Sequence, residues 1–112
     1  MGFTWPWKRQ RTSRPVSEGA VRRRLRYAGE VQAVGFRFTA QQIARRVEVA
    51  GWVENLDDGD VLVEVQGLPG QVDEFKKEVA AASTSADTWI KATLVDENDI
   101  PVVAEDSFRV RY

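Results

Sequence analysis

The amino-acid sequence predicts an α+β sandwich, with two helices packed on one face of a mostly antiparallel sheet. Short segments in which apolar and polar residues alternate indicate strands, and two longer segments with apolar residues three and four apart indicate helices. These segments follow one another as strand, helix, strand, strand, helix and strand, with a further strand at the end. Two helices of this length cannot cover both faces of the sheet, so both are expected on one side.

The first predicted strand begins near Val21 and leads through a glycine-containing loop into a helix. One side of this strand carries Arg22, Arg24 and Arg26, and the other side carries Val21, Arg23, Leu25 and Tyr27. The helix is expected to begin near Phe36 and to end near Gly51. Its apolar face consists of Phe36, Ala40, Ile43, Ala44 and Val47.

The second half of the chain begins with a predicted hairpin. Two apolar runs, residues 52–53 and 61–65, flank the sequence Asp57-Asp58-Gly59-Asp60, and Asp-Gly at such a place is a strong turn signal. A second helix is expected over residues 69–82, followed by a strand that ends at Val95 and a turn over residues 96–99. The buried face of that helix is predicted to consist of Val72, Phe75, Val79 and Ala82. The closing strand has Phe108, Val110 and Tyr112 on one face.

The residue types that are missing narrow the possible chemistry. The chain of 112 residues has the length of one domain, and it contains no cysteine and no histidine. Disulfides, a thiol nucleophile, a Ser-His-Asp triad and zinc sites with histidine ligands are therefore excluded. No dense acidic cluster suggests another metal site. The remaining side chains suit electrostatic binding and positioning of a substrate better than covalent catalysis.

Charge is distributed unevenly along the chain. Residues 1–20 have a net charge of +3 and contain two prolines without any periodicity, so we interpret them as a flexible basic N-terminal tail preceding a domain over 21–112. Phe3, Trp5 and Trp7 leave open a second role for the tail, as an anchor to a membrane surface or a partner. Residues 21–112 contain 12 basic and 16 acidic side chains, a net charge of −4, which argues against nucleic acid as a partner.

The expected location is the cytoplasm. No apolar run is long enough to span a bilayer, and the N-terminus lacks the apolar stretch of a signal peptide. No segment suggests a surface for self-association, so a monomer is expected.

The segment most informative about function is the strand-loop-helix unit over residues 25–40. A loop that enters a helix N-terminus directs unpaired backbone N–H groups at one point, where the positive end of the helix dipole also lies. Arg37, in the first turn of the predicted helix, adds a planar set of donors suited to phosphate oxygens. The residues alone leave a second interpretation open, an ordinary strand-to-helix turn with a solvated Arg37.

Two motifs in this sequence resemble those of a known family. Residues 29–37, GEVQAVGFR, resemble the acylphosphatase signature G-x-V-Q-G-V-x-F-R. Residues 51–55, GWVEN, resemble the family's second signature, G-W-V-x-N, and residues 108–112 resemble its closing strand. The resemblance covers residues 21–112. It implies a ferredoxin-like βαββαβ sandwich and the hydrolysis of a small-molecule acyl phosphate to a carboxylate and inorganic phosphate, with no metal, cofactor or covalent intermediate.

The resemblance also implies the roles of individual residues. Arg37 would bind the phosphoryl group together with backbone amides of the preceding loop, and Asn55 would orient the attacking water. The loop residues concerned are Val31, Gln32, Ala33, Val34, Gly35 and Phe36. Without the resemblance, Asn55 is equally compatible with a polar residue that bonds the backbone at a strand end.

Four positions differ from the family pattern. Ala33 replaces a glycine of the first signature, and Glu30 stands where the family often has a basic residue. Glu54, beside Asn55, also stands where the family often has a basic residue. If they point inward, each glutamate would weaken phosphate binding roughly fivefold, at a separation of about 8 Å and an effective dielectric near ~40. Glu48 replaces a glycine that often ends the first helix, which costs about 1 kcal/mol if the backbone there is left-handed.

These differences support an alternative function for the same fold, a catalytically weak or inactive module that binds phosphate or docks a partner. A third possibility is nucleic-acid binding on the sheet face, where five arginines would form a basic stripe. Such binding usually requires aromatic rings on the same face, and alternation predicts none beside these arginines. The five are Arg22, Arg24, Arg26, Arg109 and Arg111.

Overall fold

The fold follows the predicted order of elements. The computed structural model describes residues 18–30, 35–84 and 91–112, so most of the predicted tail, residues 1–17, lies outside the described residues. The elements are β1 (Val21–Glu30), α1 (Phe36–Val47), β2 (Ala50–Asn55), β3 (Val61–Gly67), α2 (Pro69–Thr84), β4 (Lys91–Ile100) and β5 (Phe108–Arg111). Neither helix of the described part is long and apolar enough to cross a membrane.

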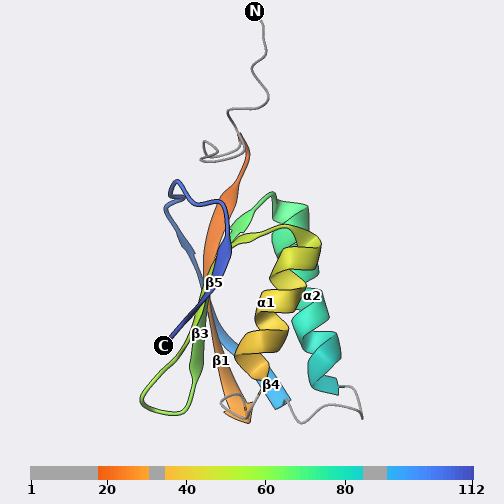
Figure 1. Ribbon diagram of the computed structural model, residues 1–112, viewed down its shortest axis with the longest axis vertical. Coiled ribbons are helices and arrows are strands. Elements are labelled where there is room, and N and C mark those ends of the chain that lie inside the picture. Colours follow the sequence, from red (N-terminus) through yellow and green to blue (C-terminus); the bar gives the residue numbers. More distant parts are fainter. Residues whose placement is uncertain (1–17, 31–34, 85–90) are drawn as a thin grey trace, which may run out of the picture.

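The strands form one sheet in the order β4-β1-β3-β2-β5. All neighbouring strands are antiparallel except β2 and β5, which are parallel. Both helices pack on the same face, and no helix of the described residues lies on the other face of the sheet (Figure 1). The predicted α+β sandwich with a mostly antiparallel sheet is therefore confirmed, and its first six elements have the ferredoxin-like order.

The apolar core lies between the sheet and the helices. Val61, Val63 and Val65 of the central strand β3 are completely buried, because alternate residues of a strand face the same side. The helices contribute residues from their apolar faces, as the spacing predicts. These residues are Phe36, Ala40, Ile43 and Ala44 from α1 and Val72, Phe75 and Val79 from α2.

Helix α1 ends earlier than predicted, at Val47 instead of near Gly51. Glu48 follows it in the left-handed conformation, with φ 64° and ψ 47°, and its backbone N–H bonds to Ala44 O. The prediction missed this end because a glutamate rarely adopts the conformation that terminates a helix in this way. Ala50 then begins β2.

Helix α2 continues to Thr84, beyond the predicted end at residue 82. Ser83, rather than Ala82, completes its buried face. The Ser83 hydroxyl donates to Val79 O at 2.9 Å and accepts from the backbone N–H of Ala92 at 3.2 Å. A polar residue is tolerated here because both contacts satisfy its hydroxyl, which a hydrophobicity pattern does not reveal.

The predicted turn over residues 96–99 is wrong, because these residues belong to β4. A register shift opposite Arg26 and Tyr27 lets the strand continue past Val95. Beyond it, Arg23 of β1 contacts Glu97 at 2.9 Å and Asp99 at 2.5 Å. These cross-strand ion pairs hold acidic residues in a strand, although Asp and Asn by themselves favour turns.

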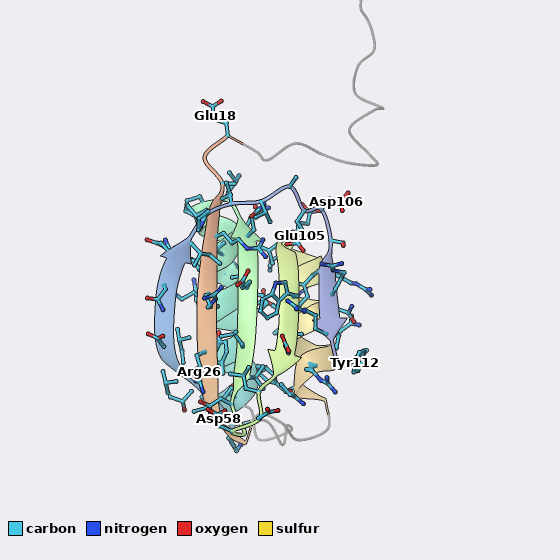
Figure 2. All side chains as sticks on the ribbon, turned by 90° about the vertical axis from the view of Figure 1, so that its left-hand side faces the viewer. Glu18, Arg26, Asp58, Glu105, Asp106 and Tyr112 are labelled. Carbon is cyan, nitrogen blue, oxygen red and sulfur yellow. The ribbon has the colours of Figure 1, made fainter. Side chains whose placement is uncertain are left out.

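A network of charged and polar side chains lies on the sheet face without helices. The Arg22 side chain is only 4% exposed and contacts Glu64 at 2.9 Å and Glu105 at 2.8 Å. Gln66 bonds the backbone of Val103 in both directions, at 2.7 and 3.0 Å. Glu105 and Val103 belong to the segment between β4 and β5, which crosses this face beside Glu105 in Figure 2. The network therefore ties that segment to the sheet.

We predict that Glu48→Gly stabilises the protein. Relief of the left-handed strain is worth about 1–2 kcal/mol, and the greater freedom of glycine in the unfolded chain offsets about 0.5–1 kcal/mol of it. A net gain of about 0.5–1 kcal/mol in the free energy of unfolding is expected from urea titration. Glu48→Ala retains a Cβ and should give no such gain; an equal gain in both variants would show that the strain does not act through the backbone.

We also predict that Glu64→Gln destabilises the fold in a pH-dependent way. Burial raises the pKa of the Glu64 carboxyl, but hydrogen bonds and charges from Arg24 and Arg22 outweigh it, so the net pKa lies below its usual value. A carboxylate whose pKa is lowered in the folded state stabilises the fold at pH values above its unfolded-state pKa. This stabilisation is lost as the pH falls through the folded-state pKa. At pH 7 the free energy of unfolding should fall by only about 2 kcal/mol, because Glu105 still pairs with Arg22.

The measurement is urea unfolding of wild type and Glu64→Gln between pH 7 and pH 3. The difference in unfolding free energy should shrink below about pH 4 as the wild-type carboxyl takes up its proton. Glu97→Gln is the matched control, because the Glu97 side chain is 27% exposed and its loss should cost about 1 kcal/mol or less. A difference for Glu64→Gln that does not change with pH would contradict the assignment.

Candidate active site

The candidate site lies where three strand ends meet the beginning of α1. Strands β1 and β2 both pair antiparallel with β3 and so run in the same direction, and β5 is parallel to β2. Their final residues therefore gather at one end of the sheet, where the trace enters α1 (Figure 1). The topology therefore brings Arg37 and Asn55 to the same end of the sheet.

The beginning of α1 is open for an anion. Gly35 precedes the helix with φ 106° and ψ −15°, and no side chain caps the helix. A Cβ at Gly35 would meet nothing within 4 Å, so the backbone conformation, and not lack of space, requires glycine there. No acidic residue lies in the first turn. The positive end of the helix dipole is thus not neutralised by the described side chains of the first turn.

Arg37 extends from this first turn toward the end of β5. Its Nη1 donates to Arg111 O at 3.1 Å, and its Cζ lies 4.6 Å from the centroid of the Tyr112 ring. Among the described residues, no carboxylate forms an ion pair with Arg37. The guanidinium has further N–H donors for a phosphate.

Asn55, the last residue of β2, contributes an unused acceptor. Its Oδ1 is buried and has no hydrogen-bond partner among the described residues. A buried polar atom without a partner costs about 1–3 kcal/mol, so a bound water or ligand would relieve this cost. In the pairing of β2 with β5, Glu54, the neighbour of Asn55, lies opposite Arg111. The carbonyl of Arg111 accepts the hydrogen bond from Arg37. Asn55 and Arg37 therefore approach the same end of β5.

Glu54 does not point to the same side as Asn55. Successive residues of a strand face opposite sides, so Glu54 lies on the sheet face without helices while Asn55 continues the face of buried Val53. Glu54 Oε1 lies 3.8 Å from Arg111 Nε. The condition for repulsion between Glu54 and a phosphate, a carboxylate that points inward, is therefore not met in this geometry.

One aromatic residue shares the face of the arginines, contrary to the sequence-based expectation. Trp52 lies beside Arg109 in the register of β2 and β5, and the Arg111 guanidinium covers its ring at 4.3 Å. Trp52 is only 9% exposed, and Arg22 and Arg24 on this face are paired with Glu64. The described residues of this face therefore offer neither an open stacking surface nor an unpaired basic stripe along β1.

The described part includes only some of the predicted loop residues. Gly35 and Phe36 are described, whereas Val31, Gln32, Ala33 and Val34 lie outside the described residues, as does the side chain of Glu30. The Phe36 ring is 1% exposed and packs 5.8 Å from the Tyr27 ring, so it anchors α1 in the core. Only the backbone of Phe36 is available to a ligand at the site.

The structure explains why the first residue of the first motif, Gly29, is a glycine. Its φ is 108°, and a Cβ there would lie 2.1 Å from the carbonyl oxygen of Lys91 in β4. The close approach of β4 excludes any side chain at this position.

Sequence reasoning missed Arg111 and Tyr112 as neighbours of Arg37, because no spacing pattern links residues 74 positions apart.

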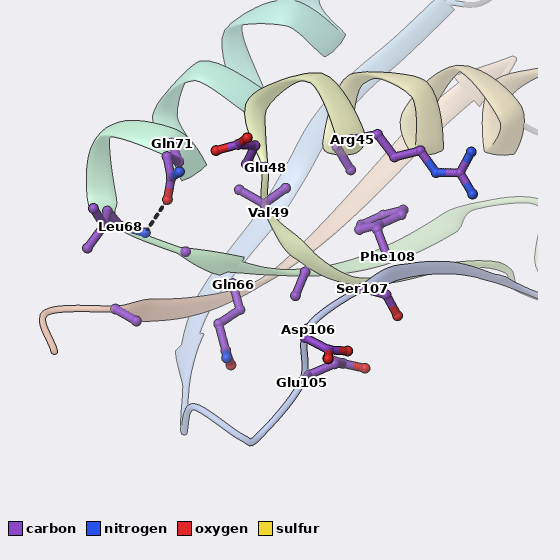
Figure 3. Close-up of a pocket in the computed structure, with 14 residues that line it drawn as sticks. Arg45, Glu48, Val49, Gln66, Leu68, Gln71, Glu105, Asp106, Ser107 and Phe108 are labelled. Carbon is purple, nitrogen blue, oxygen red and sulfur yellow. Dashed lines mark hydrogen bonds between the residues drawn. The ribbon is translucent and has the colours of Figure 1, made fainter. Parts of the chain in front are cut away.

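A pocket of about 490 Å³ lies at the other end of the sheet and is distinct from this site. Figure 3 shows its lining, which includes Glu48 after α1, Gln71 in α2 and Glu105 before β5. Helix α1 separates the two regions, because Arg37 lies in its first turn and Glu48 follows its last residue. No three acidic side chains of the described part gather as a metal site.

Comparisons with known proteins agree on one family. The family model described as Acylphosphatase matches residues 23–110. A protein named acylphosphatase from Oceanobacillus iheyensis is 41% identical over 88 residues, which cover 75% of this chain and 90% of that protein. Another of the same name, from Pediococcus pentosaceus, is 38% identical over 85 residues, covering 76% of this chain and 91% of that protein.

Solved structures show the same fold. The crystal structure of acylphosphatase from Bacillus subtilis superimposes with a TM-score of 0.67 at 27% sequence identity, covering 82% of this chain and 99% of that one. A structure of an acylphosphatase from Coxiella burnetii gives a TM-score of 0.63 at 26% identity, covering 84% of this chain and 95% of that one. The ferredoxin-like arrangement is therefore shared with these relatives.

The orientation of Glu54 leads to a prediction about phosphate affinity. Glu54→Gln should change the dissociation constant of inorganic phosphate by less than about twofold, because the carboxylate lies on the other face and beside Arg111. Isothermal titration with phosphate measures this. Glu30→Gln serves as the comparison, since Glu30 adjoins the loop and was expected to weaken binding. A severalfold gain in affinity for Glu54→Gln would mean that its carboxylate does act on the phosphate.

Proposed function

Because the chain belongs to the acylphosphatase family, we propose that it hydrolyses the carboxyl–phosphate bond of acyl phosphates to a carboxylate and inorganic phosphate. The observation that carries the proposal is Arg37, which extends from the uncapped start of α1 without a carboxylate partner among the described residues. This side chain and the helix start together favour a dianionic phosphoryl group.

The phosphoryl group would be bound from two directions. Backbone N–H groups of residues 31–36 would surround its oxygens, and Arg37 would add donors from its planar guanidinium. These contacts hold the substrate and stabilise charge on the equatorial oxygens as the reaction proceeds. Because the donors are already oriented before the substrate arrives, little reorganisation is needed in the transition state.

Asn55 would hold the nucleophile. Its Oδ1, unpaired among the described residues, would accept a hydrogen bond from a water placed in line with the phosphorus. The water oxygen forms the new P–O bond while the bond to the acyl oxygen breaks and its electron pair leaves with the carboxylate. Carboxylates with a pKa of about 4 need no proton from the enzyme to depart, and the proton of the water passes to phosphate or solvent.

A non-catalytic phosphate-binding or partner-docking module is the second candidate. Ala33 and Glu30 still favour it, because both differ from the family pattern within the first motif. Glu54 no longer supports it, since its side chain lies on the other face of the sheet. A module of this kind would bind inorganic phosphate through Arg37 but would not turn over an acyl phosphate.

The proposal is tested by benzoyl phosphate hydrolysis at neutral pH in the presence of a chelator. Wild type should turn over, and Arg37→Ala should abolish detectable turnover because the phosphoryl group loses its main charged donor. Asn55→Ala should lower kcat about 100-fold, because the water is no longer oriented, while the affinity for inorganic phosphate is kept. Initial rates by substrate absorbance and phosphate titration give both quantities.

Arg45→Ala is the matched control, because Arg45 is an exposed arginine in the last turn of the same helix. Its turnover should equal that of wild type. Retained turnover in Arg37→Ala would refute the proposed site. A folded wild type that binds phosphate but shows no turnover would support the binding module instead.

A further inference from the structure

We propose that Tyr112, together with the backbone carbonyl of Arg111, positions Arg37 for the phosphoryl group. This inference rests on the proposed function and assigns to that site a positioning residue on β5. It follows from how Arg37 is held in the described structure and from how the sheet brings Tyr112 to the beginning of α1.

An arginine that binds an anion has two conflicting requirements. Its long side chain must be held in one conformation, because a disordered guanidinium loses entropy each time a ligand binds. A carboxylate partner would hold it but would also cancel much of the charge that attracts the ligand. Arg22, Arg23 and Arg26 on β1 are each held by carboxylates in this way. Arg37 has no such partner among the described residues.

The two observed contacts of Arg37 satisfy both requirements. Arg111 O accepts from Nη1 at 3.1 Å and fixes one edge of the guanidinium. The Tyr112 ring lies 4.6 Å from Cζ, at a distance typical of cation–π attraction. Neither group carries a negative charge, and a ring contacts the face of the guanidinium while phosphate oxygens bond its edges. The remaining N–H donors therefore stay available to a phosphate.

The sheet itself determines where Tyr112 lies. Residues of β5 alternate, so Phe108 and Val110 face the helices while Arg109 and Arg111 face away. The Arg111 side chain is held on that other face by Trp52 at 4.3 Å and Glu54 at 3.8 Å. Tyr112 continues the side that faces the helices, at the end where α1 begins. Figure 2 places Tyr112 at the opposite end of β5 from Glu105.

Tyr112 has little other function in the fold. The residue is 96% exposed and does not belong to the apolar core. Its replacement should therefore leave folding unchanged, which makes it suitable for a mutational test. Phe38 is a matched control, because it is a 62% exposed aromatic residue next to Arg37 in sequence that lines a pocket with other residues of α1 and α2.

The first measurement compares wild type, Tyr112→Ala, Tyr112→Phe and Phe38→Ala with benzoyl phosphate as substrate and inorganic phosphate as ligand. Tyr112→Ala should raise KM and the dissociation constant of phosphate about two- to fivefold, the size of an exposed cation–π contact. The value of kcat should stay within about twofold of wild type, because the lost contact acts on ground state and transition state alike. Tyr112→Phe retains the ring and should behave as wild type, as should Phe38→Ala.

The second measurement needs no ligand and no turnover. Nitrogen-15 relaxation of the Arg37 Nε–H group in the free protein reports how tightly the guanidinium is held. Its order parameter should fall in Tyr112→Ala and remain at the wild-type value in Tyr112→Phe. This measurement distinguishes failure of the inference from failure of the proposed function, because it yields a result even if wild type hydrolyses no acyl phosphate.

Three results would overturn the inference. Unchanged KM, phosphate affinity and Arg37 order in Tyr112→Ala would show that the ring does not hold the guanidinium. Equal defects in Tyr112→Ala and Tyr112→Phe would assign the effect to the hydroxyl instead of the ring. An equal defect in Phe38→Ala would show that any exposed aromatic near α1 has the same effect. Weaker phosphate affinity and lower Arg37 order in Tyr112→Ala, together with wild-type values in Tyr112→Phe, support the inference.

Discussion

One constraint shapes the described part of the chain: two helices cover one face of a five-stranded sheet, and none of its helices covers the other. Each strand must therefore be apolar on one side and compatible with water on the other. On the covered face, Val61, Val63 and Val65 of β3 are completely buried. On the other face, β1 presents arginines that bond acidic residues of β3 and of the turn that precedes it. The alternation of the strands, more than any single contact, explains why this sequence folds as it does.

Charge pairing on the helix-free face also determines where β5 lies. Arg22 contacts Glu64 of β3 and Glu105, and Gln66 bonds Val103, so the segment between β4 and β5 is tied to the sheet at one end. The chain then returns along β2 as a parallel strand and reaches the end where α1 begins. A network far from the candidate site in this way places the Arg111 carbonyl beside Arg37. Fold and site are linked through a short edge strand.

The site differs from strand β1 in how its arginine is held. The β1 arginines Arg22, Arg23 and Arg26 bond carboxylates, whereas Arg37 has an uncharged ring and a carbonyl as described neighbours. The Asn55 amide oxygen is buried without a described partner. Unused donors and acceptors are costly in a folded protein and tend to occur where a ligand completes them. The proposed acyl phosphate and water would supply those partners.

Local sequence patterns determined most of the architecture and pointed to the two central residues of the proposed site. Helical spacing predicted α1 and α2, Asp-Gly predicted the hairpin, and two motifs pointed to Arg37 and Asn55. Only the tertiary structure decided that residues 96–99 extend β4, that Ser83 is buried, that Glu54 faces away from Asn55 and that Tyr112 meets Arg37. The reason is physical: periodicity and turn chemistry act over a few residues, whereas cross-strand ion pairs, register and ring contacts join residues that only the folded sheet brings together.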